Sequence, residues 1–314
     1  MRILVVGAGA LGGYFGGRLL EAGRDVTFLV RPGRAAQLAS TGLVIRSPRG
    51  DFSVAAPPMI QAEALDTPFD LVLLGCKAYD LEGAMDSFAP AVGPDTAILP
   101  LLNGMAHLDA LDRRFGKGHA LGGLCLISGA LDPEGRILHL NDLHGLTFGE
   151  RDGGRSARAE AIEATFAGAR FDGRLSQAIV QEMWEKWVFI ATLAGLTCLM
   201  RASVGDIVAA GAGDLAPALL EECAVIAEEQ GHPLSQPALA RIRAFTTAAG
   251  SPITASMLRD IEADAPVEAD HVIGDLLRRG EAAPCDSLLR LAYAHLKAHE
   301  ARRARTMARE GAGA

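Results

Sequence analysis

The stretch ILVVGAGALG, residues 3–12, decides the fold of the N-terminal half. A β-type run, Ile3–Val6, leads into three glycines spaced G-x-G-x-x-G, and a helical pattern follows. In this setting Gly7 permits a tight turn, Gly9 lets the backbone approach a diphosphate, and Gly12 lets the helix pack closely on the strand. The helix N-terminus also offers free N–H groups to an anion. The pattern therefore predicts a dinucleotide-binding strand, turn and helix.

The residue that follows the next strand points to the form of the dinucleotide. Val26–Val30 has the composition of a second strand, and an NAD site would place an acidic residue at its end to bond the ribose 2′-hydroxyl. Arg31 stands there instead, with Arg34 close behind. Two guanidinium groups suit a 2′-phosphate, so NADPH is the predicted cofactor. The other interpretation is that both arginines are solvated loop charges.

Further along, the sequence pattern changes once, from alternating strands and helices to helices alone. Leu71–Leu74 and Thr96–Leu99 extend the strand–helix alternation, which predicts a parallel sheet wrapped by helices. Leu43–Val54 and Leu121–Phe148 are predicted to be later strands and hairpins of the same domain. The fold class is therefore α/β: a Rossmann-type dinucleotide-binding domain over residues 1–172, followed by an all-helical domain over residues 173–314.

The helical half carries its own signals. Helical patterns run from Gln177 to about Arg303. They are punctuated at Gly211, Gly231, Gly250 and Pro284. The apolar stretch Trp187–Met200 is shorter than the roughly 20 residues that span a bilayer, so it is predicted to be a buried core helix. The tail Ala301–Ala314 is predicted to be frayed.

Composition narrows the partners. The net charge of −8 in 314 residues argues against a nucleic acid or an anionic membrane as a partner. It favours a small-molecule substrate and leaves a homodimer open.

The five cysteines are scattered along the sequence, which argues against disulfides and thiolate metal sites and is typical of a cytoplasmic protein. His295 and His299 are spaced for a shared metal, but without a third ligand they are interpreted as a solvated helix face, so no metal is predicted.

Three polar residues are candidates for the reacting end. Lys77 and Asn103 each follow a predicted strand closely, and ligands of open α/β sheets bind at the carboxyl ends of strands. A surface lysine and an Asn-Gly turn are the alternatives. Lys186 lies at the mouth of the apolar helix, where an ammonium is a credible proton donor, although a lysine snorkelling from a helix end would look the same.

Taken together, these motifs resemble the ketopantoate reductases, or 2-dehydropantoate 2-reductases, from Met1 to about Arg303. The segments that carry the resemblance are GAGALG from Gly7, Lys77, NGM from Asn103, WEK ending at Lys186, ASMLRDI from Ala255, and EAD from Glu268. The resemblance implies NADPH-dependent reduction of ketopantoate to pantoate, a step of pantothenate biosynthesis.

The resemblance also implies residue roles. Lys186 acts as the general acid on the substrate carbonyl oxygen. Asn103, Ser256 and Glu268 bind the substrate. The resemblance adds Lys77, Asn103 and Glu268 to the cofactor-binding residues predicted from the glycine turn and the end of the second strand, which are Gly7, Ala8, Gly9, Ala10, Leu11, Gly12 and Arg31.

The sequence departs from the family at the substrate pocket. Asparagines expected four and eight residues after the lysine are replaced by Ile190 and Ala194, and a third by Val204. The pocket is therefore predicted to be less polar, and a related but different 2-oxo acid is an open alternative to ketopantoate, because each hydrogen bond lost to a hydroxylated substrate removes about 1 kcal/mol. A non-catalytic NADPH sensor and a 2-hydroxyacid or opine-type dehydrogenase also remain open.

Overall fold

The computed structural model describes residues 1–280 and 286–312. The chain divides into two compact units, one of Met1–Leu102 with Ala106–Glu182 and the other of Asn103–Met105 with Met183–Ala314. The first unit is α/β and the second is helical, which confirms the predicted fold class.

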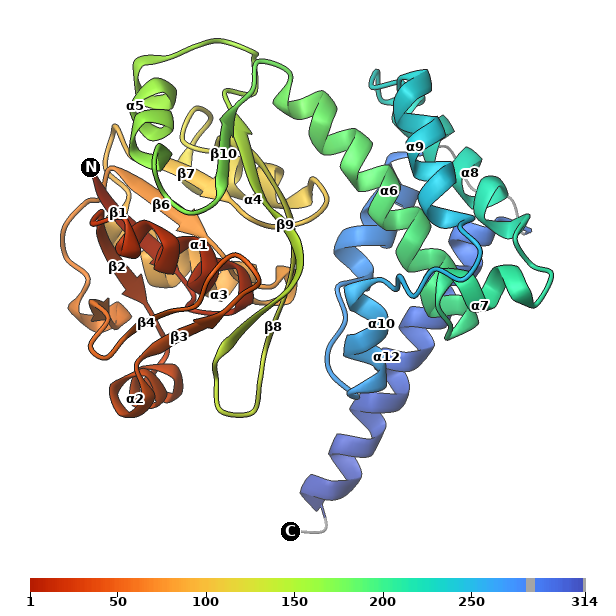
Figure 1. Cartoon of the computed structure of the whole chain (residues 1–314), viewed down its shortest axis with the longest axis horizontal. Coiled ribbons are helices and arrows are strands. Elements are labelled where there is room, and N and C mark those ends of the chain that lie inside the picture. Colours follow the sequence, from red (N-terminus) through yellow and green to blue (C-terminus); the bar gives the residue numbers. More distant parts are fainter. Residues whose placement is uncertain (281–285, 313–314) are drawn as a thin grey trace. The chain divides into compact units, whose positions relative to one another are not determined.

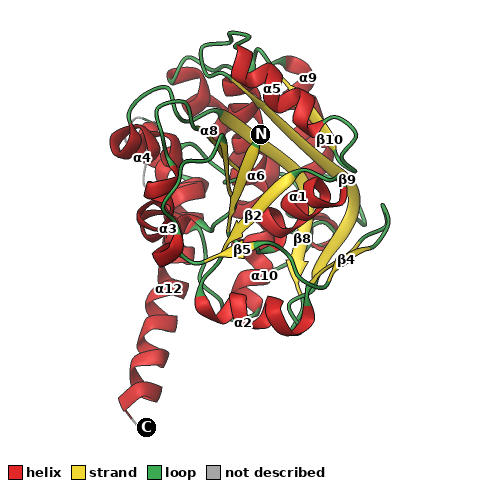
Figure 2. Cartoon of the chain, turned by 90° about the vertical axis from the view of Figure 1, so that its left-hand side faces the viewer, coloured by secondary structure: helices red, strands yellow, loops and turns green. Residues whose placement is uncertain are grey.

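The first unit is built on a parallel sheet of five strands in the order β5-β2-β1-β6-β7 (Figures 1 and 2). The strands are β1 (Arg2–Val6), β2 (Asp25–Leu29), β5 (Met59–Ile60), β6 (Leu71–Leu74) and β7 (Ala97–Pro100). The residues of β6 and β7 are all buried, as expected for strands covered on both faces. The helices of this unit are α1 (Ala10–Glu21), α2 (Pro32–Thr41), α3 (Leu81–Phe88), α4 (Ala106–Phe115) and α5 (Ala157–Phe166), with short 3₁₀ turns η1 (Ala62–Ala64), η2 (Ala78–Asp80) and η3 (Ala89–Ala91).

A second sheet accounts for the later strand predictions. Its order is β10-β9-β3-β4, with β8 paired antiparallel to β9. Its strands are β3 (Leu43–Arg46), β4 (Phe52–Val54), β8 (Gly122–Leu131), β9 (Ile137–Gly149) and β10 (Asp172–Leu175). Because β10 pairs with β9, the first unit continues past residue 172 and ends at Glu182.

Glycines on α1 explain how one helix packs against both sheets. A Cβ added at Gly16 would lie 2.7 Å from the ring of Phe28 on β2. A Cβ added at Gly17 would lie 2.7 Å from Ile45 on β3. Both distances are shorter than real Cβ contacts allow, so the glycine-rich sequence of α1 permits the close approach of both sheets.

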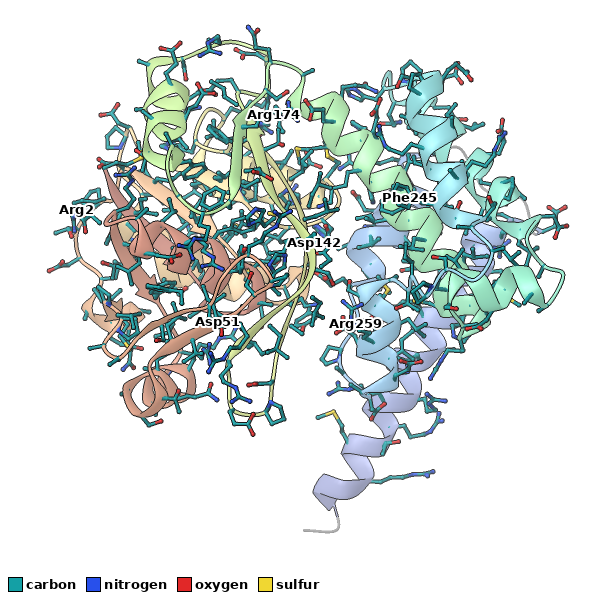
Figure 3. All side chains as sticks on the ribbon, in the orientation of Figure 1. Arg2, Asp51, Asp142, Arg174, Phe245 and Arg259 are labelled. Atoms are coloured by element: carbon teal, nitrogen blue, oxygen red, sulfur yellow. The ribbon has the colours of Figure 1, made fainter. Side chains whose placement is uncertain are left out.

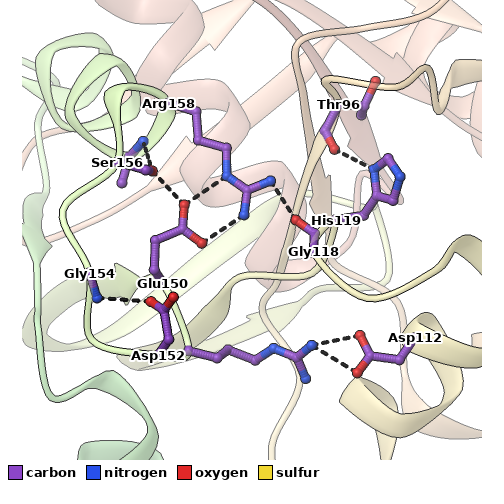
Figure 4. Close-up of polar contacts among 11 residues, drawn as sticks. Thr96, Asp112, Gly118, His119, Glu150, Asp152, Gly154, Ser156 and Arg158 are labelled. Atoms are coloured by element: carbon purple, nitrogen blue, oxygen red, sulfur yellow. Dashed lines mark hydrogen bonds and ion pairs between the residues drawn. The ribbon is translucent and has the colours of Figure 1, made fainter.

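Charged side chains fix the chain where β9 ends (Figure 4). The Glu150 carboxylate accepts hydrogen bonds from Nε and Nη2 of Arg158, each 2.7 Å long, and this pairing lowers the pKa of Glu150. Arg158 also donates to the carbonyl oxygen of Gly118, and Arg151 donates to both oxygens of Asp112. These bonds tie the loop after β9 to α5, to α4 and to the loop before β8.

A further arginine ties β10 to β9. Arg174, labelled in Figure 3, donates from Nη2 to Thr147 Oγ1 at 3.2 Å and pairs with Glu182. Within the first unit, β10 is thus held by side chains as well as by its strand pairing.

The second unit is helical throughout its described part. Its elements are most of α6 (Ile179–Met200), then α7 (Val204–Ala209), α8 (Leu215–Glu229), α9 (Gln236–Thr246), α10 (Ser256–Glu262), the π-helix η4 (Asp270–Gly274), α11 (Asp275–Arg279) and α12 (Leu288–Ala312). By length and composition α6 would suffice to cross a membrane, but 67% of its most apolar window is buried within the chain. This is the core helix that the sequence predicts. Gly211 and Gly231 have positive φ two residues after α7 and α8 end, and Gly250 has positive φ four residues after α9 ends, whereas Pro284 lies outside the described residues.

Two sequence expectations for the C-terminal part are wrong. The tail is not frayed over residues 301–312, because α12 continues to Ala312 and Arg303 Nε donates to the carbonyl oxygen of Asp264 at 2.6 Å. The interpretation of His295 and His299 as a solvated face also fails, because His299 is only 5% exposed and its Nε2 faces the carbonyl oxygen of Ala265. Within the described residues, no group of three or more metal-ligating side chains accompanies them.

Candidate active site

The glycine turn of the first unit has the geometry that its sequence predicts. Gly7 has φ +89°, and its N–H donates to the carbonyl oxygen of Leu29 on β2. A Cβ at Gly12 would lie 2.1 Å from the carbonyl oxygen of Gly7, so no other residue fits there without moving the main chain. Both glycines are therefore required by the turn itself.

Gly9 differs from its neighbours because the space beside it is open. A Cβ at this position would meet no atom within 4 Å. Gly9 is also the N-cap of α1, and no side chain caps the helix there. Open space at an uncapped helix N-terminus is what a diphosphate requires, since the first N–H groups of the helix then face the anion.

The end of β6 packs directly on this turn. A Cβ at Gly75 would lie 2.8 Å from Gly12 Cα, and the Gly75 N–H donates to the carbonyl oxygen of Val6. Cys76 and Lys77 follow at once, and Lys77 is the N-cap of η2. Lys77 therefore follows the end of β6, the strand beside β1, at the same edge of the sheet as the glycine turn.

Arg31, the N-cap of α2, forms an ion pair with a residue 49 positions away. Its Nη2 donates to Asp80 Oδ1 at 2.8 Å, and this carboxylate raises the pKa of Arg31. The side chain is 73% exposed, so solvent screens the pair and leaves the guanidinium accessible. Because Asp80 closes η2, the pair links the end of β2 to the turn that begins at Lys77.

Arg34 lies more deeply against the glycine turn. Its Nε donates to the carbonyl oxygen of Ala8, and its Nη1 donates to that of Gly135, both at 3.0 Å. Its Nη2 is buried and has no hydrogen-bond partner within the described residues. Burial lowers the pKa of Arg34. Arg34 is therefore bonded to the main chain of the glycine turn, whereas Arg31 stays exposed and is bonded to the side chain of Asp80.

The second unit brings together two of the predicted reacting residues. Lys186 Nζ donates to Asn103 Oδ1 at 2.9 Å, although the two are 83 positions apart. Asn103 belongs to a three-residue segment, Asn103–Met105, that is grouped with the helical unit although it follows β7 in sequence. The amide oxygen thus fixes the position of the ammonium group.

The face of α6 that carries Lys186 continues as an apolar surface. Ile190 and Ala194 lie one and two turns further on, and they are half-buried and buried respectively. Thr197, three turns beyond Lys186, accepts a hydrogen bond from the N–H of Ala255 at 3.2 Å. Ser256, which starts α10, is therefore held near this face of α6.

The π-helix η4 borders the Lys186–Asn103 pair. Trp187 Nε1 donates to the carbonyl oxygen of Val272 at 2.8 Å, and the Val272 N–H donates to the carbonyl oxygen of Glu268. His271 hydrogen-bonds the main chain of Asn103, and the charge of Glu268 acts on its ring. Glu268 thus lies within one helical turn of His271, which contacts Asn103.

The structure divides the predicted site residues between the two units. The glycine turn, Arg31 and Lys77 lie in the first unit, and Asn103, Lys186, Ser256 and Glu268 lie in the second. Sequence reasoning missed Asp80 and His271. The position of Asp80, three residues after Lys77, gives no sign that it pairs with Arg31. His271 directly follows the EAD segment that begins at Glu268, so that motif could have drawn attention to it.

Comparisons with known proteins agree over both units. The family model "Ketopantoate reductase PanE/ApbA" matches residues 3–153, and "Ketopantoate reductase PanE/ApbA C terminal" matches residues 178–300. An uncharacterized oxidoreductase of Bacillus subtilis (strain 168), YkpB, is 40% identical over 96% of this chain and 99% of its own length.

Two solved structures are also similar. The crystal structure of 2-dehydropantoate 2-reductase from Geobacter metallireducens GS-15 matches with a TM-score of 0.84 and 30% identity, covering 95% of this chain and 99% of that one. The structure of D-mandelate dehydrogenase with NADH and anilino(oxo)acetate matches with a TM-score of 0.83 and 22% identity, covering 96% of this chain and 99% of that one. The second likeness concerns the fold alone.

Proposed function

The chain belongs to the ketopantoate reductase family, and we propose that it reduces a small branched 2-oxo acid to the 2-hydroxy acid with NADPH. As a member of this family it is an oxidoreductase that acts on CH–OH groups and binds NAD(P)H. The proposal concerns the choice of NADPH, the substrate and the residues that act. The observation that carries it is the hydrogen bond between Lys186 and Asn103.

The glycine turn fits the dinucleotide. Gly9 leaves open the volume that a diphosphate would fill, and the residues around it, Gly7 to Gly12, would hold the diphosphate through main-chain N–H groups. When bound, the reduced nicotinamide supplies a hydride to the carbonyl carbon of the substrate. We assign Lys77, Asn103 and Glu268 to further contacts with the cofactor.

Two arginines support NADPH over NADH. Arg31 is exposed and able to exchange its partner Asp80 for a phosphate. Arg34, in the first turn of α2, donates from Nε to the carbonyl oxygen of Ala8 and so holds a second positive charge against the glycine turn. A 2′-phosphate would supply acceptors for Arg31 and would be attracted by the charge of Arg34.

Lys186 has the chemistry of the general acid. Hydride addition at the carbonyl carbon builds negative charge on the carbonyl oxygen, and an ammonium group beside it stabilises this charge and gives up a proton. The Nζ–H bond breaks as the O–H bond of the hydroxy acid forms, and solvent returns the proton to Lys186. Asn103 Oδ1 accepts one N–H of Lys186 and so directs the remaining N–H bonds.

The substrate side of the site is less polar than ketopantoate would favour. On the Lys186 face of α6, Ile190 and Ala194 offer no hydrogen bond to a substrate hydroxyl group. We assign Asn103, Ser256 and Glu268 to substrate binding, and we propose ketopantoate or a relative without its hydroxyl group as the substrate. Reduction of ketopantoate would place the protein in pantothenate biosynthesis. We also propose that it works in the cytoplasm.

The test follows NADPH oxidation with a panel of 2-oxo acids that includes ketopantoate and its dehydroxylated analogue. We expect turnover with the wild type and a loss of about 10²- to 10⁴-fold in kcat for Lys186→Ala. Lys117→Ala, which removes an exposed lysine, is the matched control and should keep full activity. Undiminished turnover of Lys186→Ala would remove Lys186 from the mechanism, and no turnover with any acid would overturn the proposed reaction.

A further inference from the structure

His271 lies where three parts of the second unit meet. It is the second residue of the π-helix η4, and π-helical turns are rare and frequent at functional sites. The next residue of η4, Val272, accepts a hydrogen bond from Trp187, the neighbour of Lys186. The π-helical turn is therefore fixed to the part of α6 that carries the proposed general acid.

The ring and main chain of His271 contact the segment that carries Asn103. A Cβ at Gly104 would lie 2.9 Å from the carbonyl oxygen of His271 and 3.2 Å from its ring Cδ2, so only glycine permits this approach. Gly104 has φ +74°, a conformation that also favours glycine. The His271 ring hydrogen-bonds the main chain of Asn103. Asn103 is thus held at its main chain by His271.

The charge state of His271 suits this contact. Burial lowers the pKa of His271, and Arg278 lowers it further, whereas Glu268, Asp275 and the hydrogen bond to Asn103 raise it. The net effect is a lowering from an ordinary value of 6.5, so the ring is neutral at pH 7. A neutral ring holds Asn103 without placing a second positive charge close to the Lys186 ammonium.

We propose that His271 is a positioning residue for the reaction, one that orients Asn103 and through it the ammonium group of Lys186. The inference rests on the proposed function of Lys186. It assigns to His271 a role that neither touches the substrate nor donates the proton. The chain of contacts runs from the His271 ring to the Asn103 main chain, and from Asn103 Oδ1 to Lys186 Nζ.

The test compares three variants by steady-state kinetics with the best 2-oxo acid of the panel. His271→Phe keeps a ring beside Gly104 but removes the hydrogen bond, and we expect kcat to fall about tenfold with less than about a threefold change in KM. His271→Gln restores a donor and should recover most of kcat. His299→Phe is the control, because His299 is a buried histidine of the same unit that contacts the carbonyl oxygen of Ala265 and the side chain of Arg302. It should keep the wild-type kcat.

A double-mutant cycle identifies the route of the effect. If His271 acts through Asn103, then adding His271→Phe to Asn103→Ala should lower kcat no further. Independent, multiplying effects would overturn the inference, as would an unchanged kcat in His271→Phe. If His271→Phe does not fold, His271→Asn replaces it. The asparagine side chain is too short to make the hydrogen bond to the Asn103 main chain, so the same fall in kcat is expected.

The two proposals fail in different ways. If the wild type is active and Lys186→Ala is not, while His271→Phe matches the wild type, the positioning role is wrong and the proposed function stands. If Lys186→Ala retains activity, the proposed function fails first, and the positioning role fails with it.

Discussion

The glycine turn of the first unit and the lysine site of the second are built in opposite ways. The turn is made of main chain from six consecutive residues, and its requirement is that Gly7 and Gly12 carry no side chain. The lysine site is made of side chains from distant segments, since Lys186 and Asn103 are 83 positions apart. A main-chain site can be recognised as a local pattern, whereas a side-chain site exists only once the fold assembles it.

This difference predicts which substitutions damage each region. An added methyl group breaks a turn that depends on main-chain contact, because the backbone has no room to yield. A removed amide or ammonium breaks the lysine site and leaves its backbone intact. The glycines of the turn therefore govern stability and binding together, whereas substitution of Asn103 or Lys186 should lower turnover or ligand binding and leave the free energy of unfolding nearly unchanged.

The largest effect should come from a comparison within the turn. Gly12→Ala places Cβ 2.1 Å from the Gly7 carbonyl oxygen, so we expect the free energy of unfolding to fall by about 3 kcal/mol or more and NADPH binding to be lost. Gly9→Ala meets no atom and should cost less than about 1 kcal/mol. It should nevertheless weaken NADPH binding strongly, because the methyl group enters the volume proposed for the diphosphate.

Urea denaturation gives the two stabilities, and titration of intrinsic fluorescence gives the two affinities for NADPH. The informative variant is Gly9→Ala, which should keep nearly the wild-type stability while losing affinity for NADPH. Wild-type affinity in Gly9→Ala would show that the open space beside Gly9 does not hold the diphosphate.

A smaller effect concerns the cofactor preference of the same unit. Arg31→Ala should raise the Kd for NADPH about 10- to 100-fold and leave the Kd for NADH within about twofold, because only the 2′-phosphate uses the guanidinium. Asp80→Asn should tighten NADPH binding, since it frees Arg31 and removes a negative charge near the phosphate.

The two variants serve as mutual controls, because they alter opposite members of one ion pair. Competition titrations with NADPH and NADH measure both preferences. An equal loss of affinity for NADPH and NADH in Arg31→Ala would mean that Arg31 stabilises the loop and does not bind the phosphate.

The fold was largely predictable because its signals are local. The first strands, the helix α1 and the all-helical second unit follow from hydrophobic period and glycine punctuation. The second sheet was not foreseen as a separate sheet, because the pairing of β9 with β3 and β10 joins segments far apart in sequence. The helical tail was missed because composition suggested fraying, whereas α12 is anchored by Arg303 to Asp264.

The site was predictable only in part, for the same reason. The glycine turn could be derived from its residues. The proposed role of Lys186 came from family resemblance, because a lysine at the start of an apolar helix segment is often only a solvated side chain without a catalytic role. The pairing of Arg31 with Asp80 and of His271 with Asn103 depends on tertiary contacts that no spacing reveals.

The smallest expected effect is a difference in reactivity between the cysteines of the two units. Cys76 is half-exposed beside the glycine turn, whereas Cys198 and Cys223 in the helical unit are buried, and burial raises the pKa of each to about 12. Because the thiolate is the reactive form, these two remain protonated at pH 8 and should resist iodoacetamide. Cys76 should be alkylated, and its rate should fall several-fold when NADPH is bound. Peptide mass spectrometry resolves each site, and NADPH-independent alkylation of Cys76 would place the cofactor away from the end of β6.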